Sequence, residues 1–67
     1  MRRFECVEGS ASKFWEVTVS DEVMTVRYGR IGTAGQTQTK SFASAAKAQA
    51  ECDKLIREKT GKGYQAV

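Results

Sequence analysis

The sequence contains no histidine and no proline, and it has only two cysteines, Cys6 and Cys52. Without histidine, the chain cannot supply the Ser–His or Cys–His pair that activates many enzyme nucleophiles. The cysteines form no CxxC motif, and two thiols are fewer than the protein ligands that a zinc site normally uses. Because both cysteines fall on apolar faces, we expect buried thiols. A disulfide between them is the alternative, which a cytoplasmic setting would oppose.

Long apolar runs are also lacking. None approaches the ~18 residues that a membrane-spanning helix requires, and no apolar stretch follows Arg2 and Arg3 as it would in a secretory signal. We therefore expect a cytoplasmic protein without membrane contact. The carboxylates show no pairing at catalytic spacing, and there is no phosphate-binding loop. The sequence thus predicts no enzyme activity, no cofactor, no metal and no small-molecule substrate.

Acidic residues are missing from one long stretch. The chain has 67 residues with a net charge of +3, yet no Asp or Glu occurs in residues 23–50, which carry Arg27, Arg30, Lys40 and Lys47. A surface built from this stretch would attract polyanions; a solvated basic face kept for solubility is the alternative. The length predicts a single domain, residues 1–67, burying only roughly 60% of its unfolded surface. That leaves little room for a deep pocket and favours a function on the outer surface.

Alternation of apolar and polar residues predicts strands over residues 2–8, 13–20, 23–31 and 36–42, separated by polar or glycine-rich turns. Ser44 is expected to cap a helix, and Gly61 and Gly63 mark its end. Residues 64–67 would form a short last strand. The prediction is an α+β fold: a small curled antiparallel sheet of four to five strands with one α-helix packed on it.

The predicted helix has an apolar side and a charged side. Its apolar stripe consists of Ala45, Ala48, Cys52, Leu55, Ile56 and Lys59, and i,i+4 ion pairs are expected for Lys47–Glu51 and Lys54–Glu58. The predicted core comprises Phe4, Trp15, Val17, Val19, Phe42, Leu55 and Ile56. One helix covers one face of such a sheet, so the other face would be left to solvent or to a partner.

Several short segments, taken together, match the motifs of one known family. Tyr28-Gly29-Arg30-Ile31-Gly32-Thr33 resembles its signature WGRxGT, and Gly35-Gln36 matches the GQ that follows. Further matches are Lys13-Phe14-Trp15-Glu16, Lys40-Ser41-Phe42, Glu58-Lys59-Thr60 and Lys62-Gly63-Tyr64. They run in the family's order over nearly the whole chain, which therefore resembles a free-standing WGR domain of the bacterial type.

The resemblance implies an antiparallel sheet with one helix, and a function at DNA. In poly(ADP-ribose) polymerases this domain contacts DNA near a strand break, where the signature aromatic lies against the sugar at the 5′ end and the signature arginine supports the contact. This chain departs from the pattern in having Tyr28 instead of tryptophan, which keeps a flat ring of smaller area. No segment resembles the polymerases' catalytic or regulatory domains, so ADP-ribose transfer is not implied.

The candidate site centres on Tyr28 and Arg30, which alternation places on one strand face. A ring beside a guanidinium suits a nucleotide; the alternative is a tyrosine packed under the helix and an arginine in a structural ion pair. Gly29 and Gly32 indicate a bulge with a hairpin turn, or a close approach of phosphate to backbone. Further candidates for sugar or phosphate contacts are Lys13, Gln36, Gln38, Lys40 and Lys62, each of which is alternatively a solvated surface residue.

We therefore predict a non-catalytic nucleic-acid-binding module that recognises DNA ends or nicks through sugar-phosphate contacts. The partner is expected to be DNA, with a possible protein partner in DNA repair or processing. The alternative function is protein–protein interaction, in which the domain docks on a nucleic-acid-processing enzyme or associates with another copy of itself.

Overall fold

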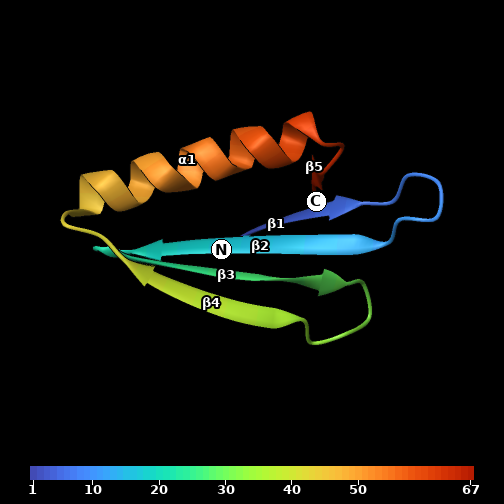
Figure 1. The fold of residues 1–67 in the computed structure, drawn as a ribbon, viewed down its shortest axis with the longest axis horizontal. Helices are drawn as coiled ribbons and strands as arrows, with labels where there is room; N and C mark the ends of the chain where they lie inside the picture. The colour runs from blue at the N-terminus through green and yellow to red at the C-terminus, as the bar shows by residue number, and fades with distance from the viewer.

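The computed structural model describes residues 1–67 as one antiparallel sheet with one helix packed on it (Figure 1). The strands are β1 (Arg2–Cys6), β2 (Lys13–Ser20), β3 (Val23–Arg30), β4 (Gln36–Ser41) and β5 (Gln65–Ala66), and the helix is α1 (Ala45–Gly61). The order of strands in the sheet is β4-β3-β2-β1-β5, and the sheet is not closed. The predicted α+β fold class is confirmed.

Local hydrogen bonds explain where the elements begin and end. The first strand stops at Cys6, earlier than predicted, because the Glu8 carbonyl accepts the Ala11 N–H at 2.9 Å and closes a turn. The β2–β3 hairpin turns at Asp21 and Glu22, with Asp21 in the left-handed region at a φ of 55°. Aspartate tolerates this conformation better than most residues do, so the polar turn expected here is confirmed.

Helix α1 begins and ends as its sequence predicts. The Ser44 side chain accepts the Lys47 N–H at 3.1 Å, which confirms the predicted cap. At the other end the Tyr64 N–H donates to the Lys59 carbonyl at 3.1 Å, and Gly63 has a φ of +96° that lets the chain turn back toward the sheet. Length and apolar character of α1 both fall short of what a membrane-crossing helix requires.

The two ion pairs predicted along α1 do not form. No Lys–Glu pair of the helix comes within 4 Å, and the side-chain contact on its surface is instead a 3.0 Å hydrogen bond from Gln49 to Asp53. The lysines on this side are exposed. Water competes for such charges, so exposed pairs gain little from being held together.

The core lies between the sheet and α1. Phe4, Trp15, Val17, Met24 and Cys52 form one buried cluster, in which the Phe4 and Trp15 rings lie 5.7 Å apart at a tilt of 48°. Of the predicted core residues, Phe4, Trp15 and Val17 are buried, whereas Val19, Phe42, Leu55 and Ile56 pack against the cluster half-buried. One helix cannot cover the full width of five strands, so the edge of the core stays partly open. Both cysteines are free, buried thiols, as expected.

The first and last strands of the chain are neighbours in the sheet. Phe4 pairs with Ala66, and the Val67 N–H donates to the Arg3 carbonyl at 3.1 Å. The short strand β5 therefore covers the outer edge of β1, as Figure 1 shows beneath the end of α1. The opposite edge of the sheet is β4, whose six residues are all exposed.

Candidate functional site

The register of β2 and β3 places the candidate residues on the helix side of the sheet. Lys13 lies opposite Arg30, and Trp15 lies opposite Tyr28. Residues directly opposite each other in an antiparallel pair project to the same face. Because Trp15 is buried against α1, Tyr28 and Arg30 also face the helix side. The structure thus confirms that Tyr28 and Arg30 share a face.

A cavity of about 330 Å³ brings several of the predicted residues together; we call it the signature cavity. It is lined by Lys13, Phe14, Tyr28, Gly29, Arg30, Lys59 and Tyr64. The structure therefore groups four of the predicted residues, Lys13, Tyr28, Gly29 and Arg30. Three of the lining side chains are cations and none is a carboxylate, so the cavity favours an anionic or electron-rich ligand.

Two glutamines of β4 hold the hydroxyl of Tyr28. The Tyr28 hydroxyl donates to Gln36 Oε1 at 3.2 Å and accepts from Gln38 Nε2 at 3.3 Å. The ring is half-buried and packs against the edge of the core cluster. Its orientation is thus fixed from both ends, while part of the ring stays accessible from the signature cavity. The two predicted alternatives are a ring that contacts a nucleotide and a ring packed under the helix. The observed position lies between them, because the ring is neither fully exposed nor covered by α1.

Arg30 ends β3 with its side chain unpaired. Its carbonyl accepts the Thr33 N–H at 3.1 Å and the Thr33 hydroxyl at 2.7 Å. Its guanidinium makes no hydrogen bond and no ion pair, and the residue is exposed. The structural ion pair considered as an alternative for this arginine is therefore absent. Its charge is available to a ligand.

Lys59 adds a cation that sequence reasoning did not assign to the site. Its Nζ lies 5.8 Å from the centre of the Trp15 ring and 5.3 Å from that of Tyr64. Burial lowers the pKa of this amine; repulsion from Lys62 and Lys13 lowers it further, while Glu58 opposes the shift. A signal existed in the sequence, since Lys59 is the one charged member of the apolar helix stripe.

Two predicted site residues lie away from the signature cavity. Lys40 lies on β4 opposite Met24, near the other end of the sheet, with its Nζ 5.3 Å from the centre of the Phe42 ring. Lys62 follows the end of α1 and is exposed; it is close enough to Lys59 to affect that pKa. The lysines that the sequence suggested as phosphate contacts therefore do not form one compact cluster.

The two signature glycines do not form a bulge. Phe14 pairs with Gly29 and Lys13 with Arg30 in unbroken register, so the predicted bulge is wrong. Gly29 instead allows a close backbone approach: a Cβ there would lie 2.8 Å from the Gly35 Cα, and one on Gly35 would collide with the Tyr28 carbonyl oxygen. Gly32, with a φ of +95°, forms the predicted turn. The β3–β4 loop thus folds back onto its own strand.

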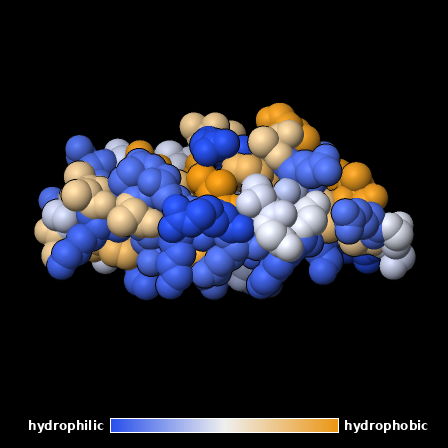
Figure 2. All heavy atoms as spheres, turned by 90° about the horizontal axis from the view of Figure 1, so that it is seen from above, coloured by the Kyte–Doolittle hydropathy of each residue, from blue (hydrophilic) through white to orange (hydrophobic).

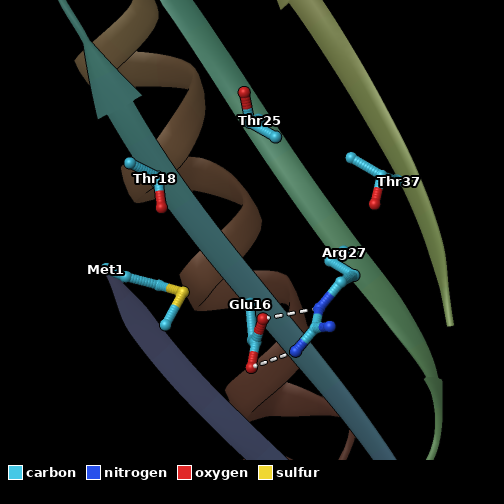
Figure 3. A pocket seen from close by; sticks show the side chains of 6 residues that line it. All are labelled: Met1, Glu16, Thr18, Thr25, Arg27 and Thr37. Carbon is cyan, nitrogen blue, oxygen red and sulfur yellow. Dashed lines mark hydrogen bonds and ion pairs between the residues drawn. The ribbon is translucent and has the colours of Figure 1, made fainter. Parts of the chain in front are cut away.

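The face of the sheet opposite to α1 carries a closed cluster of charges. Glu16, only 5% exposed, accepts from Arg3 Nη1 at 2.6 Å and from Arg27 Nε at 2.9 Å; Figure 3 shows the second interaction. The hydrogen bonds from Arg27 and Arg3 lower the pKa of Glu16, while burial acts in the opposite direction. The guanidiniums of Arg3 and Arg27 lie 4.5 Å and 5.2 Å from the centre of the Phe14 ring.

Phe14 is therefore a second apolar centre that sequence reasoning missed. It is 1% exposed although it lies on the side of the sheet without a helix. The two arginines cover its ring, and Gly35 packs against it, since a Cβ on Gly35 would lie 2.8 Å from the Phe14 ring. Beside this cluster lies a shallow cavity of about 240 Å³ lined by Met1, Glu16, Thr18, Thr25, Arg27 and Thr37 (Figure 3).

The basic side chains of the two faces therefore differ in whether they are free to bind a ligand. Arg3 and Arg27 are paired with a buried carboxylate, whereas Lys13, Arg30 and Lys59 surround an open cavity without one. Viewed from the side of the sheet on which α1 lies, the molecule is mostly hydrophilic, and hydrophobic atoms show in separate places among the polar ones (Figure 2). The arrangement on this side fits a ligand with flat apolar surfaces and negative charges.

Comparison with known proteins gives consistent matches over the whole chain. A family model described as the WGR domain matches residues 1–67. The Escherichia coli (strain K12) proteins YfeS and YehF are 36% and 41% identical to this chain, each over 64 residues that make up 96% of it. A crystal structure of a protein from Bacteroides fragilis superposes with a TM-score of 0.95 at 44% identity and covers 98% of the chain.

The matched proteins are longer than this chain. It spans 26% of YfeS, 23% of YehF and 19% of the Bacteroides fragilis chain. The WGR model describes a binding module of the nucleic-acid-binding type and not a catalytic domain.

Proposed function

Because this chain belongs to the WGR domain family, we propose that it binds DNA ends or nicks through sugar-phosphate contacts at the signature cavity. The observation that carries the proposal is that two residues line the same cavity: Tyr28, whose hydroxyl is held by two glutamines, and Arg30, whose guanidinium makes no ion pair. The ring would lie against a sugar or base, and the guanidinium would bind phosphate.

The surrounding residues have supporting roles in this proposal. Lys13 lies directly opposite Arg30 and would neutralise a neighbouring phosphate. Gly29 lines the cavity beside the tyrosine, and Gln36 orients the tyrosine. Lys40 and Lys62 lie farther out and would contact phosphates along the flanking backbone. Contacts of this kind read little sequence.

The first test compares a labelled duplex bearing a 5′-phosphorylated nick with the same duplex intact, by fluorescence anisotropy at several salt concentrations. We expect tighter binding to the nick and a slope of log affinity against log salt of about −3, since roughly three or four phosphates are neutralised. Arg30→Ala should weaken binding far more than Lys47→Ala, which removes an equal charge from an exposed position of α1. Equal losses would contradict the proposed site, and salt-independent affinity would contradict the proposed mode of binding.

Tyr28→Trp gives a second, opposite test. A larger ring at this position should strengthen stacking, so nick affinity should rise by a few-fold. Weaker binding would mean that the hydrogen bonds of the tyrosine hydroxyl to Gln36 and Gln38 contribute more than the ring area.

The exposed edge strand β4 favours protein docking as a second candidate function, because an unpaired edge can accept a further strand. Pull-down from lysate with and without nuclease separates the two functions. A partner kept after nuclease treatment would support docking, and loss of every partner would contradict it.

A further inference from the structure

Three cavities on the helix side lie next to one another, because each shares lining residues with the next. Beyond the signature cavity lies a middle cavity of about 230 Å³, lined by Trp15, Val26, Tyr28, Gln38, Leu55 and Lys59. Beyond that lies a far cavity of about 340 Å³, lined by Met24, Val26, Gln38, Thr39, Lys40, Glu51 and Leu55. Tyr28 and Lys59 line the first two cavities, and Val26, Gln38 and Leu55 line the last two. We call these three neighbouring cavities together the trough.

The trough exists because one helix is narrower than the sheet. Helix α1 packs on β2 and β3 and leaves β4, at the edge of the sheet, uncovered. The strand β4 then forms one wall and α1 the other. Arg30 at one end and Met24, which pairs with Lys40, at the other are six residues apart on β3. At the rise of an extended strand, the trough is about 20 Å long.

The floor and the walls of the trough differ in chemistry. The floor is apolar and contains Val26, the half-buried Tyr28 and the 3% of Trp15 that stays exposed, with Leu55 of α1 beside them. The lining cations are Lys13, Arg30, Lys59 and Lys40, and they occur at both ends, whereas Glu51 is the one carboxylate. None of the four cations takes part in an ion pair.

This combination fits single-stranded nucleic acid better than duplex or protein. An unpaired strand offers exposed bases for an apolar, aromatic floor and phosphates for cations spaced along it. A duplex presents mainly its sugar-phosphate backbone, so the floor would stay unused. A peptide seated on this floor would need negative charges at both ends to match the lysines and Arg30.

We propose that the trough holds the unpaired strand that continues from a DNA end, running from the Arg30 end toward Lys40. This inference rests on the proposed function, because the signature cavity would hold the junction from which the strand departs. It adds a ligand, the single-stranded overhang, and a direction in which that overhang runs.

The test compares a blunt duplex with the same duplex carrying a single-stranded thymidine overhang of about eight nucleotides, within the range of site sizes known for single-strand binders. We expect the overhang to raise affinity by about tenfold. Lys40→Ala should reduce the ratio of overhang to blunt affinity about threefold. Lys54→Ala, an equal change at an exposed helix position outside the trough, should leave the ratio unchanged. Thermal melting of each variant controls for folding.

A second readout uses the single tryptophan of the chain. Trp15 forms part of the middle cavity, so a thymidine oligonucleotide seated in the trough should change its fluorescence. An overhang advantage with no fluorescence change and no effect of Lys40→Ala would place the strand elsewhere and overturn the proposal.

The two proposals fail differently. Equal binding of blunt and overhang duplexes, with nick preference retained, would overturn the trough proposal and leave the proposed function intact. No binding to any of these ligands at low salt would overturn both. Self-association that is lost in Lys40→Glu and unaffected by oligonucleotide would assign the trough to a second copy of the chain and overturn the proposal.

Discussion

Arg27 and Arg30 lie three residues apart on strand β3, and they show how differently the two faces of the sheet use the same charge. Arg27 faces away from α1 and donates to both carboxylate oxygens of Glu16. Arg30 faces the helix side and makes no ion pair. On the face without a helix, the arginine over the Phe14 ring is neutralised by a carboxylate. On the helix side, the basic side chains line an open cavity.

The difference shows that a stretch of sequence rich in basic residues can contribute fewer unpaired positive charges to the folded surface than its composition suggests. Residues 23–50 contain no acid, yet the neighbouring strand β2 supplies Glu16 to Arg27 through their direct pairing. A carboxylate with two guanidinium donors is held more firmly than an exposed pair would be. The cations that line the signature cavity are unpaired, whereas Arg3 and Arg27 on the opposite face are neutralised by Glu16.

The largest expected change in stability tests whether Phe14 forms a buried apolar core on the face of the sheet without a helix. Phe14→Ala should reduce the free energy of unfolding by about 3–5 kcal/mol, because it removes a fully buried ring. A domain of this size has a margin of about the same amount, so the variant should be largely unfolded. Urea denaturation followed by circular dichroism measures the change. Phe42→Ala, at a half-buried ring, should cost clearly less; the reverse order would contradict a core beneath the arginines.

A smaller effect is expected from opening the charge cluster. Glu16→Gln should cost about 1–2 kcal/mol of unfolding free energy, since both guanidiniums are partly exposed and regain water. It should also make the two faces more alike, because Arg3 and Arg27 become available and affinity for intact duplex should rise. Glu22→Gln removes the same charge from an exposed turn and releases no arginine. If both variants raised duplex affinity equally, net charge and not the cluster would be the cause.

The smallest effect concerns pH. The hydrogen bond from Arg27, together with that from Arg3, holds the pKa of Glu16 below its ordinary value in the folded chain, so the unfolded chain binds this proton more readily than the folded one does. The stability that Glu16 contributes is then present above the ordinary pKa of a glutamate, about 4.3, and is lost as the pH falls through its lower folded pKa. Unfolding free energies measured from neutral pH into acid should fall less steeply for Glu16→Gln than for the wild type. Parallel curves would mean that other carboxylates dominate acid unfolding.

Local signals in the sequence predicted much of the fold. Strand alternation, the Ser44 cap and the polar β2–β3 turn depend on residues close together in the chain, and all three were confirmed. The ion pairs along α1 and the bulge at Gly29 were wrong. A glycine in a strand has the same local pattern whether it allows a bulge or a close approach, and Gly35, six residues later, decides between them.

The site was predicted in part for the same reason. Alternation was enough to place Tyr28 and Arg30 on one face, but it could not reveal that Lys59 returns to them from the end of α1. The burial of Phe14 depends on Arg3, Arg27 and the folded-back loop, which come from three separate segments. Contacts between distant segments have no local pattern in a single sequence.

The pairing of β1 with β5 has a consequence for how such a unit is combined with others. Because the Val67 N–H binds the Arg3 carbonyl, the chain enters and leaves the domain from adjacent strands. A unit whose ends lie side by side can be inserted into a loop of another protein, or joined at either end, without being pulled open. That geometry suits a domain that recurs as roughly a quarter or less of longer proteins.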